Sequence, residues 1–394
     1  MKECPISDTE NREKIAIVVV GYDRPASTRR LLDSLATAVY ETDDVPLVVS
    51  IDCSGNEELY RYVSDFEWTH GNKYVFIRQE RLGLKNHIFQ CGDLSCHFKA
   101  VVILEDDVFA APDFYRYMVA AVEKYGADER VACISGYFNP LYGYVGLPHV
   151  PMAGYDVFAM QEVSSTGECF TATMWQKFRT WFSLHDPDSF DMDHYEMPEQ
   201  IKRWRRAWTK FYNAYMVEKD LYCIYPVFPV ITNCGDVGEH NVGSMALVQT
   251  GLMMGRRDYS MPDFVVLPRY DIFGNNTALY DSLNLGPDEL CLDLYGNNPN
   301  INGKRYVLTI RKMPYKAVRS FGLSFRPQEL NVMMRVPGSE IVLYDTNVPE
   351  GKRTKAAIPD SVILYHLHGF NIWFLLQVVI GQIRNSIRKR LRLK

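Results

Sequence analysis

Short apolar runs alternate with amphipathic stretches along the first 135 residues of the chain. Five of these runs are rich in β-branched residues and span residues 15–21, 46–52, 73–77, 100–104 and 130–135. Their apolar positions are continuous instead of alternating, which is typical of parallel strands that are buried on both faces. Helical patterns lie between them, for example at Leu31, Leu32 and Leu35. The repeated strand–helix units predict an α/β fold with a mostly parallel, Rossmann-like sheet flanked by helices.

The sequence after residue 135 predicts further helices, a small second domain and a terminal helix. Residues 136–165 have the Gly-, Tyr- and Pro-rich composition of loops, and residues 166–225 return to helical character. Residues 281–365 hold short strand-like runs separated by Gly and Pro, which indicates a small β-rich appendage. The expected organisation is a polar segment 1–14, an α/β domain 15–280 with halves 15–135 and 136–280, the appendage 281–365 and a terminal helix 366–394.

The C-terminal segment combines an apolar stripe with positive charge. Apolar residues recur every three or four positions at Ile372, Leu376, Val379, Ile383, Ile387 and Leu391. Residues 381–394 contain six basic residues and no acidic residue. Such a basic amphipathic helix is typical of helices that lie on an anionic membrane surface. The alternative is a packed or dimer-forming terminal helix whose basic face is solvated.

Composition narrows the class of protein further. The 394 residues include 43 Lys and Arg against 48 Asp and Glu, and the resulting net charge of −5 does not favour a nucleic-acid binder. The nine Cys residues contain no CxxC pair, so neither a zinc site nor a disulfide framework is expected. Residues 1–14 lack the apolar core of a signal peptide. We therefore expect a cytoplasmic protein that attaches peripherally to the inner face of the cell membrane.

Charged side chains follow several of the predicted strands. In open α/β sheets, ligands bind outside the carboxyl ends of the strands, which is where Arg24, Asp52 and the triplet Glu105-Asp106-Asp107 lie in this sequence. Three adjacent acids at the end of a buried strand repel one another unless a cation or hydrogen-bond donors compensate them. A hard divalent ion, Mn²⁺ or Mg²⁺, suits such oxygen ligands. The alternative is a solvated turn whose acids precede the next helix.

Three segments resemble the GT-A glycosyltransferases, in particular the N-acetylglucosaminyltransferase I family and its bacterial relatives. Leu104–Val108 is similar to the metal-binding segment of that family. Gly21–Pro25 and Val49–Cys53 are similar to its two nucleotide loops. The resemblance extends over residues 15–245, and it implies a GT-A-like fold and a UDP-sugar donor.

The resemblance also implies a role for each residue at the strand ends. Arg24 and Asp52 would contact the uracil, and Asp107 would ligate the metal directly. Glu105 and Asp106 would lie around the ribose and the water shell of the metal. Two alternatives remain open: Asp52 as a cap of the next helix, and Arg24 as a surface charge.

Two further segments match loops that relatives place near the donor. Gly83 and Asn86 match a loop near the nucleotide. His240 lies in a Gly-containing turn and would touch the diphosphate or the metal. Since a lone His is more often structural, both interpretations of His240 stay open.

An inverting transfer needs a carboxylate that accepts the proton of the acceptor hydroxyl. The acid-rich stretch 186–199 is the expected source of this base, and similarity around residues 198–200 places Asp193 on the family's base. Asp191 is the next candidate in the same stretch. Glu168 stands where relatives often carry a Trp, so it would bind hydroxyls or act as the base, unless the alignment is displaced there.

Together these features predict an inverting, metal-dependent glycosyltransferase, either a hexosyl- or an N-acetylhexosaminyltransferase. Its donor would be a UDP-sugar, and its acceptor would be a glycan or lipid-linked glycan in bacterial surface polysaccharide synthesis. One alternative is a nucleotidyltransferase, although Gly21–Pro25 is not the Gly-rich, basic phosphate loop that such enzymes use. The other alternative is a non-catalytic scaffold that binds glycans or membranes.

Overall fold

The structure is a computed structural model that describes residues 6, 8–142, 146–152, 154–185, 190–204, 207–238, 246–299, 301, 303–351, 357–367 and 371–392. The chain divides into two compact units. Unit 1 contains most of the chain up to Ala278, and unit 2 contains the chain from Leu279 together with Leu141–Val150. All the predicted site residues that the structure describes lie in unit 1.

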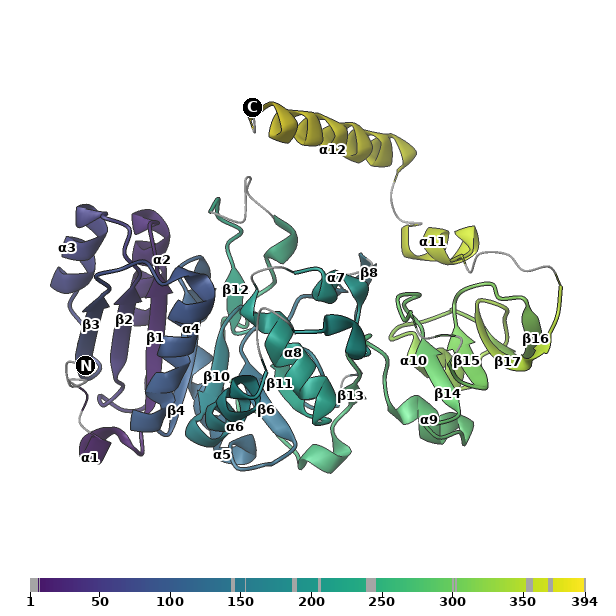
Figure 1. Cartoon of the computed structure of the whole chain (residues 1–394), viewed down its shortest axis with the longest axis horizontal. Coiled ribbons are helices and arrows are strands. Elements are labelled where there is room, and N and C mark those ends of the chain that lie inside the picture. Colours follow the sequence, from purple (N-terminus) through teal and green to yellow (C-terminus); the bar gives the residue numbers. More distant parts are fainter. Residues whose placement is uncertain are drawn as a thin grey trace. The chain divides into compact units, whose positions relative to one another are not determined.

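A nine-stranded sheet forms the centre of unit 1, in the order β13-β9-β11-β6-β10-β4-β1-β2-β3 (Figure 1). Its strands are β1 (Ile15–Gly21), β2 (Leu47–Ile51), β3 (Lys73–Ile77), β4 (Ala100–Glu105), β6 (Val131–Ser135), β9 (Val157–Met160), β10 (Glu168–Thr171), β11 (Tyr222–Pro226) and β13 (Arg269–Tyr270). The pairs β1–β2, β1–β4, β2–β3, β6–β11 and β9–β13 are parallel. β10 runs antiparallel between β4 and β6, and β9 runs antiparallel to β11. The sheet is therefore mostly parallel, as the continuous apolar runs predicted.

The predicted strands of the first half are all present. β1 and β3 have the predicted bounds, β4 and β6 differ from them by one residue at one end, and β2 is one residue shorter at each end. The helical character expected for residues 166–225 is correct for two long helices but wrong for β10 and β11. Four or five apolar residues are too few to separate strand from helix by their periodicity alone, so these strands carried no clear sequence signal.

Six helices flank the sheet: α2 (Pro25–Ala36), α3 (Glu57–Asp65), α4 (Gly83–Asp93), α5 (Phe114–Tyr125), α6 (Ala172–Ser183) and α8 (Trp208–Glu218). Helices α4, α6 and α8 pack against one another over one face of the sheet (Figure 1). Helices α2, α3 and α5 pack in a core with alternate residues of the strands, such as Ile17, Val19, Val102 and Leu104. The central strands are thus covered on both faces, which explains why their apolar runs are continuous.

A two-stranded sheet joins β5 (Val108–Ala110) to β12 (Ile231–Asn233). Its antiparallel register pairs Val108 with Asn233. Beyond that pair, the Cys234 N–H donates to the backbone carbonyl of Asp107 at 2.7 Å. This sheet therefore brings the chain after β12 next to the acidic triplet, although the two segments are far apart in the sequence.

Unit 2 is built on a four-stranded sheet in the order β14-β15-β17-β16. Its strands are β14 (Leu290–Asp293), β15 (Tyr306–Thr309), β16 (Tyr315–Phe321) and β17 (Ile341–Pro349), and α10 (Glu329–Met333) follows β16. The fully buried carboxylate of Asp293 accepts hydrogen bonds from Thr309 and Arg311, both at 2.7 Å. The β-rich appendage and the large α/β sheet confirm the predicted fold class.

The predicted terminal helix is present as α12 (Ile372–Arg392). Large apolar side chains along it are exposed, for example Trp373 at 72% and Ile383 at 54%. Among the residues that the structure describes, no helix combines the length and the apolarity needed to cross a bilayer. The remaining short elements are α1 (Asp8–Asn11), η1 (Leu94–His97), β7 (Leu141–Tyr142), β8 (Leu147–Pro148), η2 (Met192–His194), α7 (Glu199–Lys202), η3 (Ala246–Val248), η4 (Phe264–Val266), α9 (Ala278–Leu283) and α11 (Asp360–Leu367).

Candidate active site

The predicted site residues gather where the parallel strands of unit 1 end. Because β1, β2 and β4 are parallel neighbours, their carboxyl ends lie at one edge of the sheet. Arg24 follows β1 as the N-cap of α2, Asp52 follows β2, and Glu105 is the last residue of β4. β10 runs in the opposite direction, so its first residue, Glu168, lies at the same edge. The topology thus assembles one site from segments that are separate in the sequence.

Arg24 bridges two members of the acidic triplet. Its Nε donates to Oδ2 of Asp106 at 3.2 Å, and its Nη2 donates to the other oxygen of that carboxylate. Its Nη1 donates to Oδ2 of Asp107 at 3.1 Å. A planar guanidinium matches a carboxylate in this two-point geometry, whereas an ammonium group does not. The alternative that Arg24 is a plain surface charge is therefore wrong, and its contact with uracil stays a prediction.

Burial and repulsion raise the proton affinity of the triplet. Burial raises the pKa of Glu105 to about 8, with further increases from Asp107 and Asp106 and an opposing effect of Arg24. Burial raises the pKa of Asp106 to about 6, although Arg24 lowers it. Burial lowers the pKa of Arg24, but the two aspartates together raise it by more, so the guanidinium stays charged. The triplet is thus short of compensating positive charge.

The carboxylate oxygens of the triplet are ligands that suit a hard divalent cation. Oε1 of Glu105 is buried without a hydrogen-bond partner, and the Asp107 side chain is 17% exposed. Within the described ranges, no three His, Cys, Asp or Glu side chains are grouped to hold a metal. An ion at Asp107 would therefore draw further ligands from a bound diphosphate, as Mg²⁺ sites commonly do. His240, the second predicted metal residue, lies outside the described residues.

A second charged cluster beside the triplet was not singled out from the sequence. Asp236 accepts from Arg30 Nη1 at 3.2 Å, from Arg30 Nη2 at 2.5 Å and from Ser27 Oγ at 2.6 Å. On the same segment, Asn233 Nδ2 donates to Oδ1 of Asp107 at 3.3 Å. These contacts tie the chain after β12 to α2 and to the triplet. An acid in a Gly-rich turn is the only local signal for this cluster, because its partners lie some two hundred residues away.

Asp52 caps a helix from the end of β2. Its Oδ1 accepts from the N–H groups of Cys53 and Leu82, and its Oδ2 accepts from that of Gly83, all at 2.9 Å. The residue is 3% exposed. Leu82 and Gly83 belong to the start of α4, so Asp52 caps that helix from outside. The alternative that Asp52 caps the next helix along the chain, α3, is wrong, because Asn56 caps α3. The contact between Asp52 and uracil stays a prediction.

Replacing Asp52 by Ala is expected to lower the free energy of unfolding by about 3 kcal/mol, because a buried charged acceptor is removed from three N–H donors. Thermal and urea unfolding measure this loss, and Asp33→Ala on the exposed side of α2 is the matched control. If UDP affinity is unchanged in Asp52→Ala protein that is still folded, Asp52 serves as a cap alone. UDP affinity could also fall by more than the fraction of unfolded protein accounts for. Such a fall supports the uracil contact.

The two predicted residues of the following loop lie at the start of α4. Gly83 has a φ of +71°, a conformation that Gly adopts without the strain of a side chain. Asn86 is exposed and donates to the carbonyl of Leu82 at 3.2 Å. It also lines a groove of about 410 Å³ between α4 and α6, together with Lys85 and Phe182. Gly83 is thus hydrogen-bonded to Asp52, and the nearness of Gly83 and Asn86 to the nucleotide stays a prediction.

The three candidates for the catalytic base differ sharply in exposure. Glu168 is 2% exposed, faces the same side of the sheet as Ile103, and has an Oε1 without a hydrogen-bond partner. Burial, and secondarily Glu105, hold its pKa well above the usual range. Asp191 and Asp193 are exposed at η2, where the Asp193 N–H donates to Asp191 Oδ1 at 2.9 Å. Exposure favours these two over Glu168 as the group that meets an acceptor.

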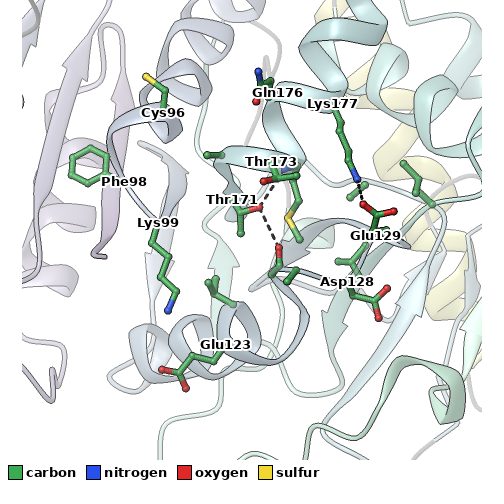
Figure 2. A pocket seen from close by; sticks show the side chains of 18 of the residues that line it. Cys96, Phe98, Lys99, Glu123, Asp128, Glu129, Thr171, Thr173, Gln176 and Lys177 are labelled. Carbon is green, nitrogen blue, oxygen red and sulfur yellow. Dashed lines mark hydrogen bonds and ion pairs between the residues drawn. The ribbon is translucent and has the colours of Figure 1, made fainter. Parts of the chain in front are cut away.

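A cavity of unit 1 lies away from this edge. It has a volume of about 830 Å³ and is lined by the residues before β4, the end of α5 and the start of α6. Figure 2 shows Lys99, Glu123 and Thr171 around it, with the ion pair of Lys177 and Glu129 at one side. These elements meet at the amino ends of the parallel strands, so this cavity is separate from the candidate active site.

The fold and the acidic triplet define unit 1 as a GT-A-like α/β unit. Residues 1–140 match the GNT-I family. The matched region includes Arg24, Asp52, Gly83, Asn86 and the triplet. The match confirms the resemblance to the N-acetylglucosaminyltransferase I family that the sequence predicted.

Solved glycosyltransferase structures are also similar to the chain. Mannosyltransferase PcManGT from Pyrobaculum calidifontis, in complex with GDP-Man and Mn²⁺, is 16% identical with a TM-score of 0.32, over 45% of this chain and 49% of that one. S. aureus TarS 1-349 with UDP-GlcNAc is 14% identical with a TM-score of 0.37, over 59% and 62%. GalNAc-T7 with UDP, GalNAc and Mn²⁺ is 13% identical with a TM-score of 0.37, over 55% and 43%. The chain thus spans less than two thirds of each of these proteins.

Proposed function

We propose that the chain is an inverting, metal-dependent glycosyltransferase that moves a hexosyl or N-acetylhexosaminyl group from a UDP-sugar to a glycan or lipid-linked glycan. The proposed setting is the synthesis of a bacterial surface polysaccharide. The observation that carries the proposal is the undercompensated triplet Glu105-Asp106-Asp107 at the carboxyl end of β4, beside Arg24 and the Asp52-capped start of α4. The match of residues 1–140 to the GNT-I family supports the same function.

The residues of this edge suit the departure of a nucleoside diphosphate. A divalent ion at Asp107 would supply the charge that neutralises the leaving diphosphate. Asp52 retains a second lone pair on Oδ2 that can accept the N3–H of uracil, since that oxygen receives one backbone hydrogen bond. Asp193, with Asp191 as the second candidate, would take the proton of the acceptor hydroxyl on the far side of the sugar.

A donor screen tests this function. UDP-sugars are incubated with the full chain and Mn²⁺, with and without membrane extract, and released UDP is measured. We expect one UDP-sugar to give UDP release that the extract stimulates. Release of sugar 1-phosphate in place of UDP, with transfer of the uridylyl group, would identify a nucleotidyltransferase. Binding of UDP without turnover of any sugar would favour the non-catalytic scaffold.

We further propose that α12 attaches the protein to an anionic membrane surface. Its apolar residues are exposed, and six basic residues without an acidic one lie within residues 381–394. Each basic residue near such a surface contributes about 1 kcal/mol, in addition to the burial of the apolar face. The attachment would place the site near a lipid-linked acceptor.

Deleting residues 370–394 is expected to abolish binding to vesicles that contain phosphatidylglycerol, while activity on a water-soluble acceptor mimic persists. Binding of the full chain should weaken but not vanish as salt rises, because salt screens the charges over about 8–10 Å and leaves apolar burial intact. Liposome co-sedimentation at several phosphatidylglycerol contents measures both effects. Equal sedimentation of the two forms would contradict the attachment and favour a packed or dimerising helix.

A further inference from the structure

The guanidinium of Arg24 occupies the carboxylate oxygens that a divalent ion would use. It engages both oxygens of Asp106 and one oxygen of Asp107. The other oxygen of Asp107 accepts from Asn233. Both oxygens of Asp107 therefore already have donors. A metal ion cannot coordinate Oδ2 of Asp107 along the direction that the Arg24 N–H occupies.

The charge balance at this edge of the sheet makes Arg24 a strong competitor of a metal ion for the oxygens of Asp106 and Asp107. Asp106 and Asp107 have side-chain exposures of 5% and 17%, so solvent compensates them poorly. The neighbouring guanidinium, that of Arg30, is committed to Asp236 through two hydrogen bonds. Among the described residues, Arg24 is thus the cation in contact with both Asp106 and Asp107, and its single charge compensates them in part. A second cation at the same oxygens would be repelled by it in a poorly solvated place.

The position of the Arg24 side chain also allows it to move away from Asp106 and Asp107. This side chain is 24% exposed, whereas that of Asp106 is 5% exposed, and it makes no capping hydrogen bond although Arg24 occupies the N-cap position of α2. A diphosphate offers a guanidinium the same two-point geometry as a carboxylate. Binding of a nucleoside diphosphate would therefore give Arg24 a new anion in place of Asp107, and this role would replace the predicted contact of Arg24 with uracil.

We infer that Arg24 is an internal counter-cation that keeps divalent ions off Asp106 and Asp107 until a nucleoside diphosphate binds. This inference rests on the proposed function, because it assigns an order of binding at the same site. The nucleotide and the metal ion bind together, and the metal ion alone binds weakly. A protein with this arrangement binds a divalent ion only weakly when no nucleotide-sugar is bound.

The test compares Mn²⁺ binding with and without UDP in the full chain, using the electron paramagnetic resonance signal of free Mn²⁺. Without UDP, Arg24→Gln is expected to bind Mn²⁺ at least about tenfold more tightly than the wild type, because the competing charge is gone. With UDP, this advantage should disappear. The matched control is Arg29→Gln, which removes one positive charge from α2 at a side chain stacked 4.3 Å from the Tyr62 ring centroid. It should change Mn²⁺ affinity by less than about twofold.

Arg24→Lys provides a second variant in case the Gln variant does not fold. It keeps the charge but cannot bridge two carboxylates, so its Mn²⁺ affinity without UDP should lie between those of the other two proteins. Equal affinities of wild type, Arg24→Gln and Arg24→Lys without UDP would overturn the inference, even if Mn²⁺ binds the wild type with UDP. Absence of Mn²⁺ binding in all proteins, with or without UDP, would overturn the metal-dependent function as well.

Discussion

Asp107→Asn is expected to lower the affinity for UDP in the presence of Mn²⁺ by about 100-fold or more, because the variant loses the carboxylate that would ligate the metal directly. Its amide oxygen can still accept from Asn233, whereas its NH2 group cannot accept from Arg24. Since Arg24 keeps its contacts with Asp106, the fold should persist. Isothermal titration of UDP with and without Mn²⁺ measures the effect. The Mn²⁺-dependent part of the affinity should disappear, while any metal-independent part remains.

The matched control for Asp107→Asn is Asp258→Asn. Asp258 lies in the same unit, has a side chain that is 96% exposed and pairs with Arg116 at the surface. The control loses the same charge without touching the triplet, so its UDP affinity should equal that of the wild type. Mn²⁺-dependent UDP binding that is as tight in Asp107→Asn as in the control would refute Asp107 as a metal ligand.

Asp193→Asn is expected to reduce transfer by about 10²- to 10⁴-fold and to leave UDP-sugar binding unchanged, because the base acts only once the acceptor attacks. Since Asp193 is exposed, its replacement should not lower the free energy of unfolding by more than about 0.5 kcal/mol. Initial rates with the donor found in the screen, together with donor binding measured separately, distinguish a chemical defect from a binding defect.

Asp191 offers a neighbouring control for the base, because it is also exposed and differs mainly in accepting the Asp193 N–H as the N-cap of η2. A large rate loss in Asp191→Asn with full activity in Asp193→Asn would move the base to Asp191. Glu168→Gln tests the third candidate for the base. Because Glu168 is buried beside Glu105, a rate loss in that variant together with lower stability would indicate a structural role in the floor of the site.

The placement of the acidic triplet illustrates how much local sequence conveys. A β-branched run followed by Glu105-Asp106-Asp107 is visible as a pattern, since burial on both faces requires apolar residues at every position of the strand. The same reasoning located the ends of β1 and β2, and with them Arg24 and Asp52. What a carboxylate at such an end contacts is a different matter. Asp52 accepts from the start of α4, thirty residues later, and nothing around position 52 encodes that partner.

The sequence by itself determined that the chain has a mostly parallel α/β sheet, a β-rich appendage, a basic amphipathic terminal helix and an acidic cluster at the end of a buried strand. These features follow from periodicity and composition, which act over a few neighbouring residues. Only the tertiary structure decided that Arg24 bridges Asp106 and Asp107, that Asp236 joins Arg30 beside them, and that Glu168 is buried. Each of these depends on which strands become neighbours. Strand order is set by packing of the whole sheet, so the partners of a charged side chain are fixed by long-range contacts that no local pattern records.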